Sequence, residues 1–280
     1  MKGGAIRVDA HQHFWQIGRG DYGWLTPELE VLYRDYVPED LLPLLAQQQI
    51  DATILVQAAP TLAETEYLLR LAEQHTQIAG VVGWVDFASP GAVADIQRLA
   101  RHPKLVGLRP MLQDIADTDW MLRAELHPAY EAMTEAGLVF DALVTPRHLP
   151  SLLQLLRRYP ELRVVIDHAA KPQIRDAAFQ PWAEQMAQLA AETQACCKLS
   201  GLVTEAGERW SVADLQPYVD HLLQTFGSER LLWGSDWPVC LLAADYAQWR
   251  QASEQLLEGV EDTDGIFGLN AARVYGVGGG

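Results

Sequence analysis

The sequence predicts a single α/β domain folded as a (β/α)8 barrel, and three observations support this. Short β-rich segments alternate with longer amphipathic helical patterns along the chain. Eight strand segments within 280 residues match the size of such a barrel. The turn after the first strand, DAHQHFW (9–15), lacks the glycine-rich phosphate loop that a doubly wound open sheet usually carries there.

The expected strands are short, and several are apolar on both faces, as is typical of buried parallel strands. The segments ATILVQ (52–57) and RVVIDHA (163–169) show this composition most clearly. The eight expected strands are 5–10, 52–57, 79–87, 105–111, 138–144, 163–169, 196–202 and 230–237.

Amphipathic helices are expected between these strands. The pattern over 61–75 places Leu68, Leu71 and Ala72 on one face. The pattern over 89–102 begins with a serine cap and an early proline. Further helices are expected over 145–160, 178–195, 211–227 and 244–259.

We expect one domain over residues 1–280, without an internal boundary or linker. Residues 14–50 form an elaborated first connection, which we expect to supply a lid or a pocket wall. Its aromatic residues include Trp15, Tyr22, Trp24, Tyr33 and Tyr36. The last residues, 277–280, are glycine-rich and are expected to form a flexible tail.

The composition argues against several classes of function. A net charge of −16 disfavours nucleic acids and anionic membranes as partners, because both are polyanions. The sequence shows neither an apolar run of eighteen residues nor a secretory signal pattern, and three cysteines are too few for a disulfide framework. We therefore expect a cytoplasmic protein, monomeric or homodimeric, that acts on a small molecule.

Polar residues recur at the ends of the expected strands, where barrel enzymes carry their active sites. His11 and His13 are two residues apart, so on a strand their imidazoles point the same way, about 6–7 Å apart along the chain. His168 lies at the end of the sixth strand and Asp236 at the end of the eighth. Three imidazoles and one carboxylate are together what a mononuclear metal site requires.

Each of these residues also has an ordinary structural explanation. His168 would serve as a hydrogen-bonded core histidine, and Asp236 would serve as a helix cap. Asp167 is expected to stabilise a loop, and Lys198 to pair with a charged partner or extend toward solvent. The functional interpretation gains weight because the polar residues occur together at one end of hydrophobic strands.

Six motifs occur in order along almost the whole chain: VDAHQHFW (8–15), GLRP (107–110), DHAAKP (167–172), KLSGL (198–202), GSDWP (234–238) and NAARVYG (270–276). Together they resemble the amidohydrolase superfamily, and more closely its sugar-lactonase branch of fuconolactonase- and rhamnonolactonase-like enzymes. The resemblance implies a distorted (β/α)8 barrel that hydrolyses its substrate at the C-terminal mouth. It matches His11 and His13 to the first-strand pair, and His168 and Asp236 to the later histidine and the last-strand aspartate.

The sequence departs from the superfamily members that bind two metals. At the end of strand four it has Arg109 and Pro110 in place of a bridging lysine, and after strand seven it has Ser200 in place of a further histidine. The resemblance therefore implies either no required cofactor or one divalent metal, zinc. If a metal is bound, the expected ligands are His11, His13, His168 and Asp236.

Hydrolysis of a lactone requires a nucleophilic water, a base and stabilisation of the oxyanion. We expect Asp236 to be the base, with its pKa raised by burial. We expect His11, His13 and His168 to polarise the carbonyl, directly or through zinc. Arg109 is the expected anchor, because its planar fork suits carboxylates and paired hydroxyls. The other expected substrate contacts are Trp15, Trp84, Gln57 and Lys171.

Two other functions remain open from the sequence. One is a zinc-dependent decarboxylase or hydratase acting on a small aromatic or sugar acid, which would use a similar set of three histidines and one aspartate. The other is a non-catalytic barrel that binds a sugar without turnover.

Overall fold

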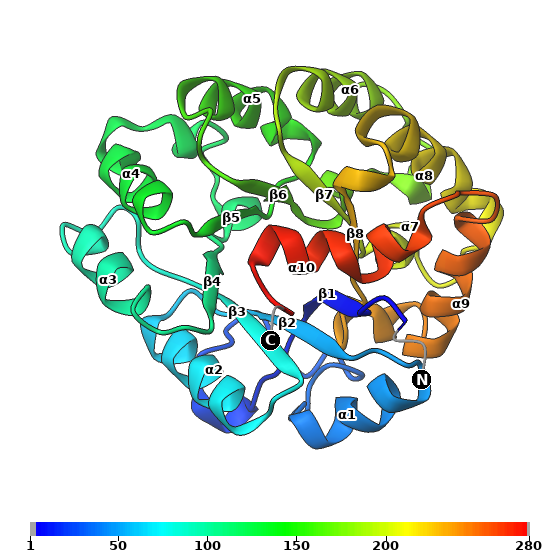
Figure 1. Cartoon of the computed structure of the whole chain (residues 1–280), viewed down its shortest axis with the longest axis horizontal. Coiled ribbons are helices and arrows are strands. Elements are labelled where there is room, and N and C mark those ends of the chain that lie inside the picture. Colours follow the sequence, from blue (N-terminus) through cyan, green and yellow to red (C-terminus); the bar gives the residue numbers. More distant parts are fainter. Residues whose placement is uncertain (1–3, 279–280) are drawn as a thin grey trace.

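The computed structural model describes residues 4–278, and it confirms the expected (β/α)8 barrel. Eight parallel strands are hydrogen-bonded in chain order from β1 to β8, and helices surround them (Figure 1). None of the helices within residues 4–278 is long and apolar enough to cross a membrane. The expected cytoplasmic location stays a prediction.

The strands are buried along almost their whole length, as two-sided apolar segments should be. Most are shorter than expected at their C-terminal ends, whereas β1 begins and ends later than the expected segment 5–10. Their bounds are β1 (Val8–Gln12), β2 (Ala52–Val56), β3 (Ile78–Gly83), β4 (Leu105–Leu108), β5 (Val139–Ala142), β6 (Val164–Ile166), β7 (Cys196–Leu199) and β8 (Leu231–Trp233).

All six expected helices are present with slightly shorter bounds. They are α2 (Leu62–Gln74), α3 (Ala92–Leu99), α5 (Leu149–Arg158), α6 (Trp182–Glu192), α8 (Val212–Phe226) and α9 (Tyr246–Leu256). The structure adds α1 (Pro38–Gln47), α4 (His127–Glu135), α7 (Leu202–Ala206) and α10 (Asn270–Tyr275), which the sequence patterns did not predict. The first connection, 14–50, contains α1 and the short 3-10 turn Ile17–Arg19.

Two backbone hydrogen bonds join the first and last strand segments and bring their motifs together. The N–H of His13 donates to the carbonyl of Trp237 at 2.7 Å, and the N–H of Asp236 donates to the carbonyl of His11 at 2.8 Å. The residues expected to form the site therefore lie where the barrel closes.

The opposite end of the barrel is covered by α10. In Figure 1 this helix lies across the strands beside β1 and β8. Ala271, Val274 and Tyr275 pack against apolar residues inside the barrel, such as Val8 and Val165. A second and larger core lies between the strands and the outer helices. The sequence predicted no helix here, because its six residues are too few to show a clear period.

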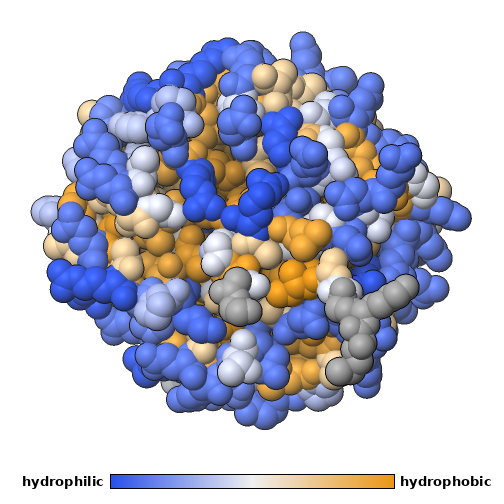
Figure 2. Space-filling view, in the orientation of Figure 1, coloured by the Kyte–Doolittle hydropathy of each residue, from blue (hydrophilic) through white to orange (hydrophobic). Residues whose placement is uncertain are grey.

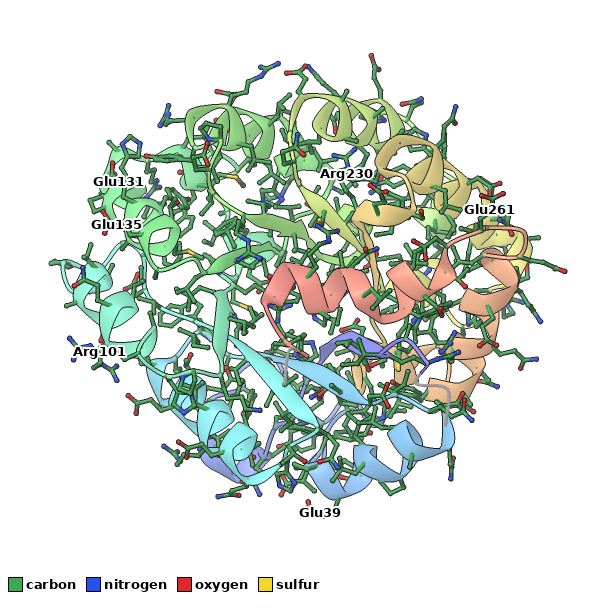
Figure 3. The ribbon with its side chains drawn as sticks, in the orientation of Figure 1. Glu39, Arg101, Glu131, Glu135, Arg230 and Glu261 are labelled. Carbon is green, nitrogen blue, oxygen red and sulfur yellow. The ribbon has the colours of Figure 1, made fainter. Side chains whose placement is uncertain are left out.

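The face over α10 is mostly hydrophilic at its rim, with apolar residues toward its centre (Figure 2). Charged residues such as Glu39, Arg101 and Glu131 lie at this rim (Figure 3). Of the expected tail over 277–280, residues 279–280 lie outside the described residues. The N–H of Val277 donates to the carbonyl of Ala272 at 2.9 Å, so the described part of that tail turns back onto α10.

Candidate active site

The three histidines and the aspartate expected at the strand ends converge at the C-terminal mouth of the barrel. The Nε2 atoms of His11 and His13 are 3.2 Å apart. Asp236 Oδ1 lies 3.3 Å from His13 Nε2, 3.8 Å from His11 Nε2 and 3.9 Å from His168 Nε2. All four residues are buried. The alternation of side chains at the end of β1 therefore does turn His11, and His13 directly after the strand, toward one point.

The backbone around His168 is unusual and is supported by its neighbours. His168 and Asp236 both have left-handed φ angles, 51° and 55°, which are uncommon for such residues. Ser200 Oγ is 2.8 Å from His168 Nδ1. A Cβ added to Gly201 would lie 2.8 Å from the same nitrogen. The Ser200–Gly201 pair thus holds the imidazole of His168.

A buried charge cluster lies directly behind His11. Lys198 Nζ is 3.0 Å from His11 Nδ1, 2.5 Å from Asp141 Oδ2 and 3.0 Å from Asp167 Oδ1. Asp167 Oδ1 is also 3.3 Å from His11 Nδ1. The expected pairing of Lys198 is confirmed. Its contact with a site histidine was missed, because β1 and β7 are brought together only by the closed sheet.

Arg109 enters the site after β4 and is held by two fixed acceptors. Its Nη1 donates to Asp167 Oδ2 at 3.3 Å, and its Nη2 donates to the carbonyl of Gln57. Gln57 Nε2 in turn donates to the carbonyl of Arg109 at 2.7 Å. Gln57 is completely buried and does not line this cavity, so it supports Arg109. The expectation that Gln57 contacts the substrate is therefore not met in this structure.

A cavity of about 260 Å³ opens over these residues. Its polar lining includes His13, Arg109, His168, Lys171 and Asp236. Two of the five expected substrate contacts, Arg109 and Lys171, therefore border this cavity together with three of the four expected catalytic residues. His11 is fully buried beneath the lining, and its Nε2 contacts the lining residues His13, Arg109 and Asp236 at 3.2, 3.4 and 3.8 Å.

The two tryptophans expected to contact the substrate, Trp15 and Trp84, do not line the cavity of about 260 Å³. Trp15 is completely buried, donates its Nε1–H to the carbonyl of Arg34 at 2.8 Å, and lies behind the site, so it does not stack on a substrate in this structure. Trp84 lines an adjoining cavity of about 610 Å³. Trp24 lines both cavities and donates to the carbonyl of Ala58 at 2.7 Å. The first connection therefore supplies a pocket wall through Trp24.

Comparison with known proteins agrees with this geometry. The sequence profile of the amidohydrolase family matches residues 8–277. The chain belongs to the amidohydrolase family. It is 49% identical over 276 residues to an L-fucono-1,5-lactonase of Burkholderia ambifaria, covering 96% of this chain and 95% of the relative. An L-fucono-1,5-lactonase of Burkholderia multivorans is 40% identical over 290 residues, with 97% and 96% covered.

Solved structures show the same fold in this amidohydrolase family. The crystal structure of an amidohydrolase from Burkholderia multivorans with bound zinc has a TM-score of 0.92 and 38% sequence identity. The match covers 98% of this chain and 100% of that one. The same similarity holds for a second crystal form of that protein with bound HEPES.

The protonation of this amidohydrolase site is governed by burial and by its own histidines. Burial alone would raise the pKa of Asp236, but His168, His13 and His11 outweigh it and hold this pKa below its usual range. The expectation of a raised pKa was wrong, because three imidazoles surround one carboxylate. Burial lowers the pKa of His168 to about 4, although Asp236 opposes this. At neutral pH the site therefore holds an ionised Asp236 and a neutral His168.

His11, His13 and Asp236 fit one divalent ion in kind and in spacing, since their ligand atoms lie within 4.8 Å of one another; His168 groups in the same way with His11 and Asp167. Zinc bonds of about 2.0–2.1 Å in a tetrahedron place ligand atoms roughly 3.3–3.5 Å apart. The distances among His11, His13 and Asp236, 3.2 to 3.8 Å, are close to this range, and His168 Nε2 lies 3.9 Å from Asp236 Oδ1. A metal would require His11 to carry its proton on Nδ1, since its Nε2 would be the ligand.

Proposed function

We propose that this amidohydrolase hydrolyses an aldonolactone of the L-fucono type to the open-chain aldonic acid. The chain is a lactone-hydrolysing enzyme, and its near full-length similarity to two proteins named L-fucono-1,5-lactonase supports this substrate class. The observation that carries the proposal is an ionised carboxylate among imidazoles and a guanidinium, beside a cavity of about 260 Å³. That volume suits one sugar ring.

The proposed mechanism starts with a water molecule held beside Asp236. Asp236 takes a proton from this water as its oxygen adds to the lactone carbonyl. Arg109 and His168 line the same cavity and stabilise the charge that develops on the carbonyl oxygen. Collapse breaks the bond from the carbonyl carbon to the ring oxygen, and Asp236 returns its proton to the leaving alkoxide.

A divalent ion has a defined place in this proposal. His11, His13, His168 and Asp236 would hold it, and a bound zinc would polarise the lactone carbonyl. A lactone has a better leaving group than an amide, so the residues named above carry the proposed steps themselves.

The first test follows proton release with a pH indicator on L-fucono, L-rhamnono, D-arabinono, L-galactono and D-galactono lactones. We expect rapid enzyme-dependent acidification with the L-fucono lactone and its stereochemical relatives. Asp236→Asn should lower kcat by about 100-fold or more, because a general base contributes about 10²–10⁴-fold. The matched control Asp220→Asn changes an exposed carboxylate on α8 and should keep parental turnover.

Two outcomes would contradict the proposal. An Asp236→Asn variant within about twofold of the parent would remove the assigned base. The absence of acidification across the whole panel would remove the lactonase assignment and favour decarboxylation or hydration of a small acid.

A further inference from the structure

Residues 168–171 form one left-handed turn beside the catalytic cavity. The φ angles are 51°, 51°, 59° and 52° for His168, Ala169, Ala170 and Lys171. The N–H of Lys171 donates to the carbonyl of His168 at 2.8 Å, which closes the turn in the manner of a 3-10 helix. A left-handed backbone costs free energy at every residue other than glycine, and such residues normally occur singly. A run of four therefore requires support from its surroundings.

The geometry of this turn determines which of its side chains reach the cavity. With three residues per turn, residues that are three apart lie on the same side. His168 and Lys171 are three apart, and both line the cavity of about 260 Å³. Ala169 and Ala170, which lie between them, are completely buried in the hydrophobic core. The motif DHAAKP (167–172) thus presents two polar residues to the cavity and two small residues to the core.

A side chain from an outer helix holds the backbone of this turn. The indole N–H of Trp182 donates to the carbonyl of Ala169 at 2.7 Å. Trp182 is the first residue of α6 and is buried. Its ring packs against those of Phe179 and Tyr218, with centroids 5.7 and 5.3 Å away. The packed indole therefore gives the carbonyl of Ala169 a donor in a fixed position. Trp182 itself lines neither cavity of the site.

We propose that Trp182 is a positioning residue that locks residues 168–171 in the left-handed turn and so directs His168 and Lys171 into the cavity. It acts through the carbonyl of Ala169. Without the indole N–H this buried carbonyl loses its partner, and the turn relaxes toward a backbone that is less costly for alanine. The inference rests on the proposed lactone hydrolysis only for its effect on turnover, because the turn is present without substrate.

The variant test is Trp182→Phe, which removes the N–H and keeps an aromatic ring. We expect kcat to fall about tenfold and KM to rise about threefold or more, because His168 and Lys171 are both displaced. A role in stability alone would lower the fraction of folded enzyme, and hence the apparent kcat, without changing KM. Parental kcat and KM, or a loss of kcat alone, would overturn the proposal.

A glycine in the turn should rescue the loss of the indole N–H. Glycine adopts a left-handed backbone without the cost that alanine has there. Ala169→Gly alone should keep parental kcat and KM, and its combination with Trp182→Phe should recover most of the lost kcat and the parental KM. If Trp182→Phe has the same effect in both backgrounds, its role is general packing and the proposal is overturned. A loss of kcat of about tenfold in Ala169→Gly alone would also overturn it.

Trp233→Phe is the matched control, since Trp233 is another completely buried tryptophan. Its indole N–H donates to Ser253 Oγ on α9 at 2.8 Å, so the hydrogen bond that it loses does not involve residues 168–171. This variant should be destabilised like Trp182→Phe but keep parental kcat and KM. An equal rise of KM would show that the loss of any buried indole donor has this effect, and would overturn the specific role of Trp182.

Hydrogen exchange of the parent protein, followed by NMR, tests the same contact without a variant or a substrate. If the indole holds the turn, the Nε1–H of Trp182 and the amide N–H of Lys171 become accessible in one opening. Their protection factors should then agree within about tenfold. A larger difference would show that the turn opens independently of Trp182 and would overturn the proposal. A protein that meets this expectation but hydrolyses no lactone would contradict only the proposed function.

Discussion

Gly201 is a residue whose missing side chain determines where His168 lies. It has a φ of +69° and follows β7, and a Cβ at this position would come within 2.8 Å of the imidazole. That distance is far below van der Waals contact, so the ring must move if any side chain is added here. The left-handed φ of Gly201 adds a separate backbone cost to such a change.

We predict that Gly201→Ala lowers kcat about tenfold or more and the free energy of unfolding by about 1–3 kcal/mol. Gly137→Ala is a matched control, since Gly137 has a φ of +67° but no atom within 4 Å of an added Cβ. Its effect should be limited to backbone strain of about 1 kcal/mol, with parental turnover. Urea unfolding and lactone turnover of both variants measure the difference, and equal losses of kcat would contradict the prediction.

The start of α2 organises the loop that follows β2 at the rim of the site. Thr61 Oγ1 accepts from the N–H of Glu64 at 3.0 Å, which caps the helix. The carboxyl group of Glu64 turns back and accepts from the N–H groups of Ala58 and Ala59, at 2.9 and 3.0 Å. Ala58 lines the cavity. Burial raises the pKa of Glu64 to about 8, although these backbone hydrogen bonds oppose the shift.

This raised pKa predicts a pH dependence of stability. Between the ordinary glutamate pKa of about 4.5 and its raised pKa of about 8, Glu64 is deprotonated in the unfolded chain but still protonated in the folded chain. The Glu64 contribution to the free energy of unfolding should therefore fall as pH rises, by about 1.4 kcal/mol per pH unit in this range. Glu64→Gln should remove this contribution, so the variant gains stability relative to the parent from pH 5 to pH 8. Urea unfolding at four pH values tests this, and a constant difference would refute it.

At the scale of the whole molecule, the carboxylate of Asp9 links the first strand of the barrel to the segment that follows the last strand. Asp9 Oδ1 accepts from the N–H of Ser235 at 2.8 Å and from that of His11 at 3.1 Å. Asp9 Oδ2 accepts from the hydroxyl of Tyr246 in α9 at 2.9 Å. Asp9 is completely buried. It therefore connects β1, the loop after β8 and an outer helix at the place where the sheet closes.

We predict that Asp9→Ala lowers the free energy of unfolding by about 3 kcal/mol or more, because it leaves several buried donors without a partner. Turnover should fall as well, since His11 and Asp236 lie on the two segments that Asp9 joins. Tyr246→Phe removes one of these hydrogen bonds and should cost about 1 kcal/mol with little change in kcat. Chemical unfolding and turnover of the two variants check the prediction, and an Asp9→Ala protein as stable as Tyr246→Phe would contradict it.

The alternation of strands and helices, the strand-end position of the polar residues and the convergence of His11 and His13 were predictable from the sequence alone. Each depends on a short-range period: 2 along a strand, about 3.6 along a helix. His168 and Asp236 were found because parallel strands of a barrel all end at one face. The motifs GSDWP (234–238) and DHAAKP (167–172) lie at the C-terminal ends of the eighth and sixth expected strands.

Other features of the site depend on contacts between residues far apart in the chain, which form only in the closed sheet. Lys198 and Asp141 lie 57 residues apart, and Tyr275 meets the same cluster from the last helix. Trp15 is buried while Trp24 lines the cavity, although both belong to one aromatic-rich connection. The lowered pKa of Asp236 depends on three imidazoles from β1 and the loop after β6. Periodicity along the chain determines which face a side chain takes, whereas its neighbours across the barrel, and hence its charge and solvent access, depend on contacts between distant segments.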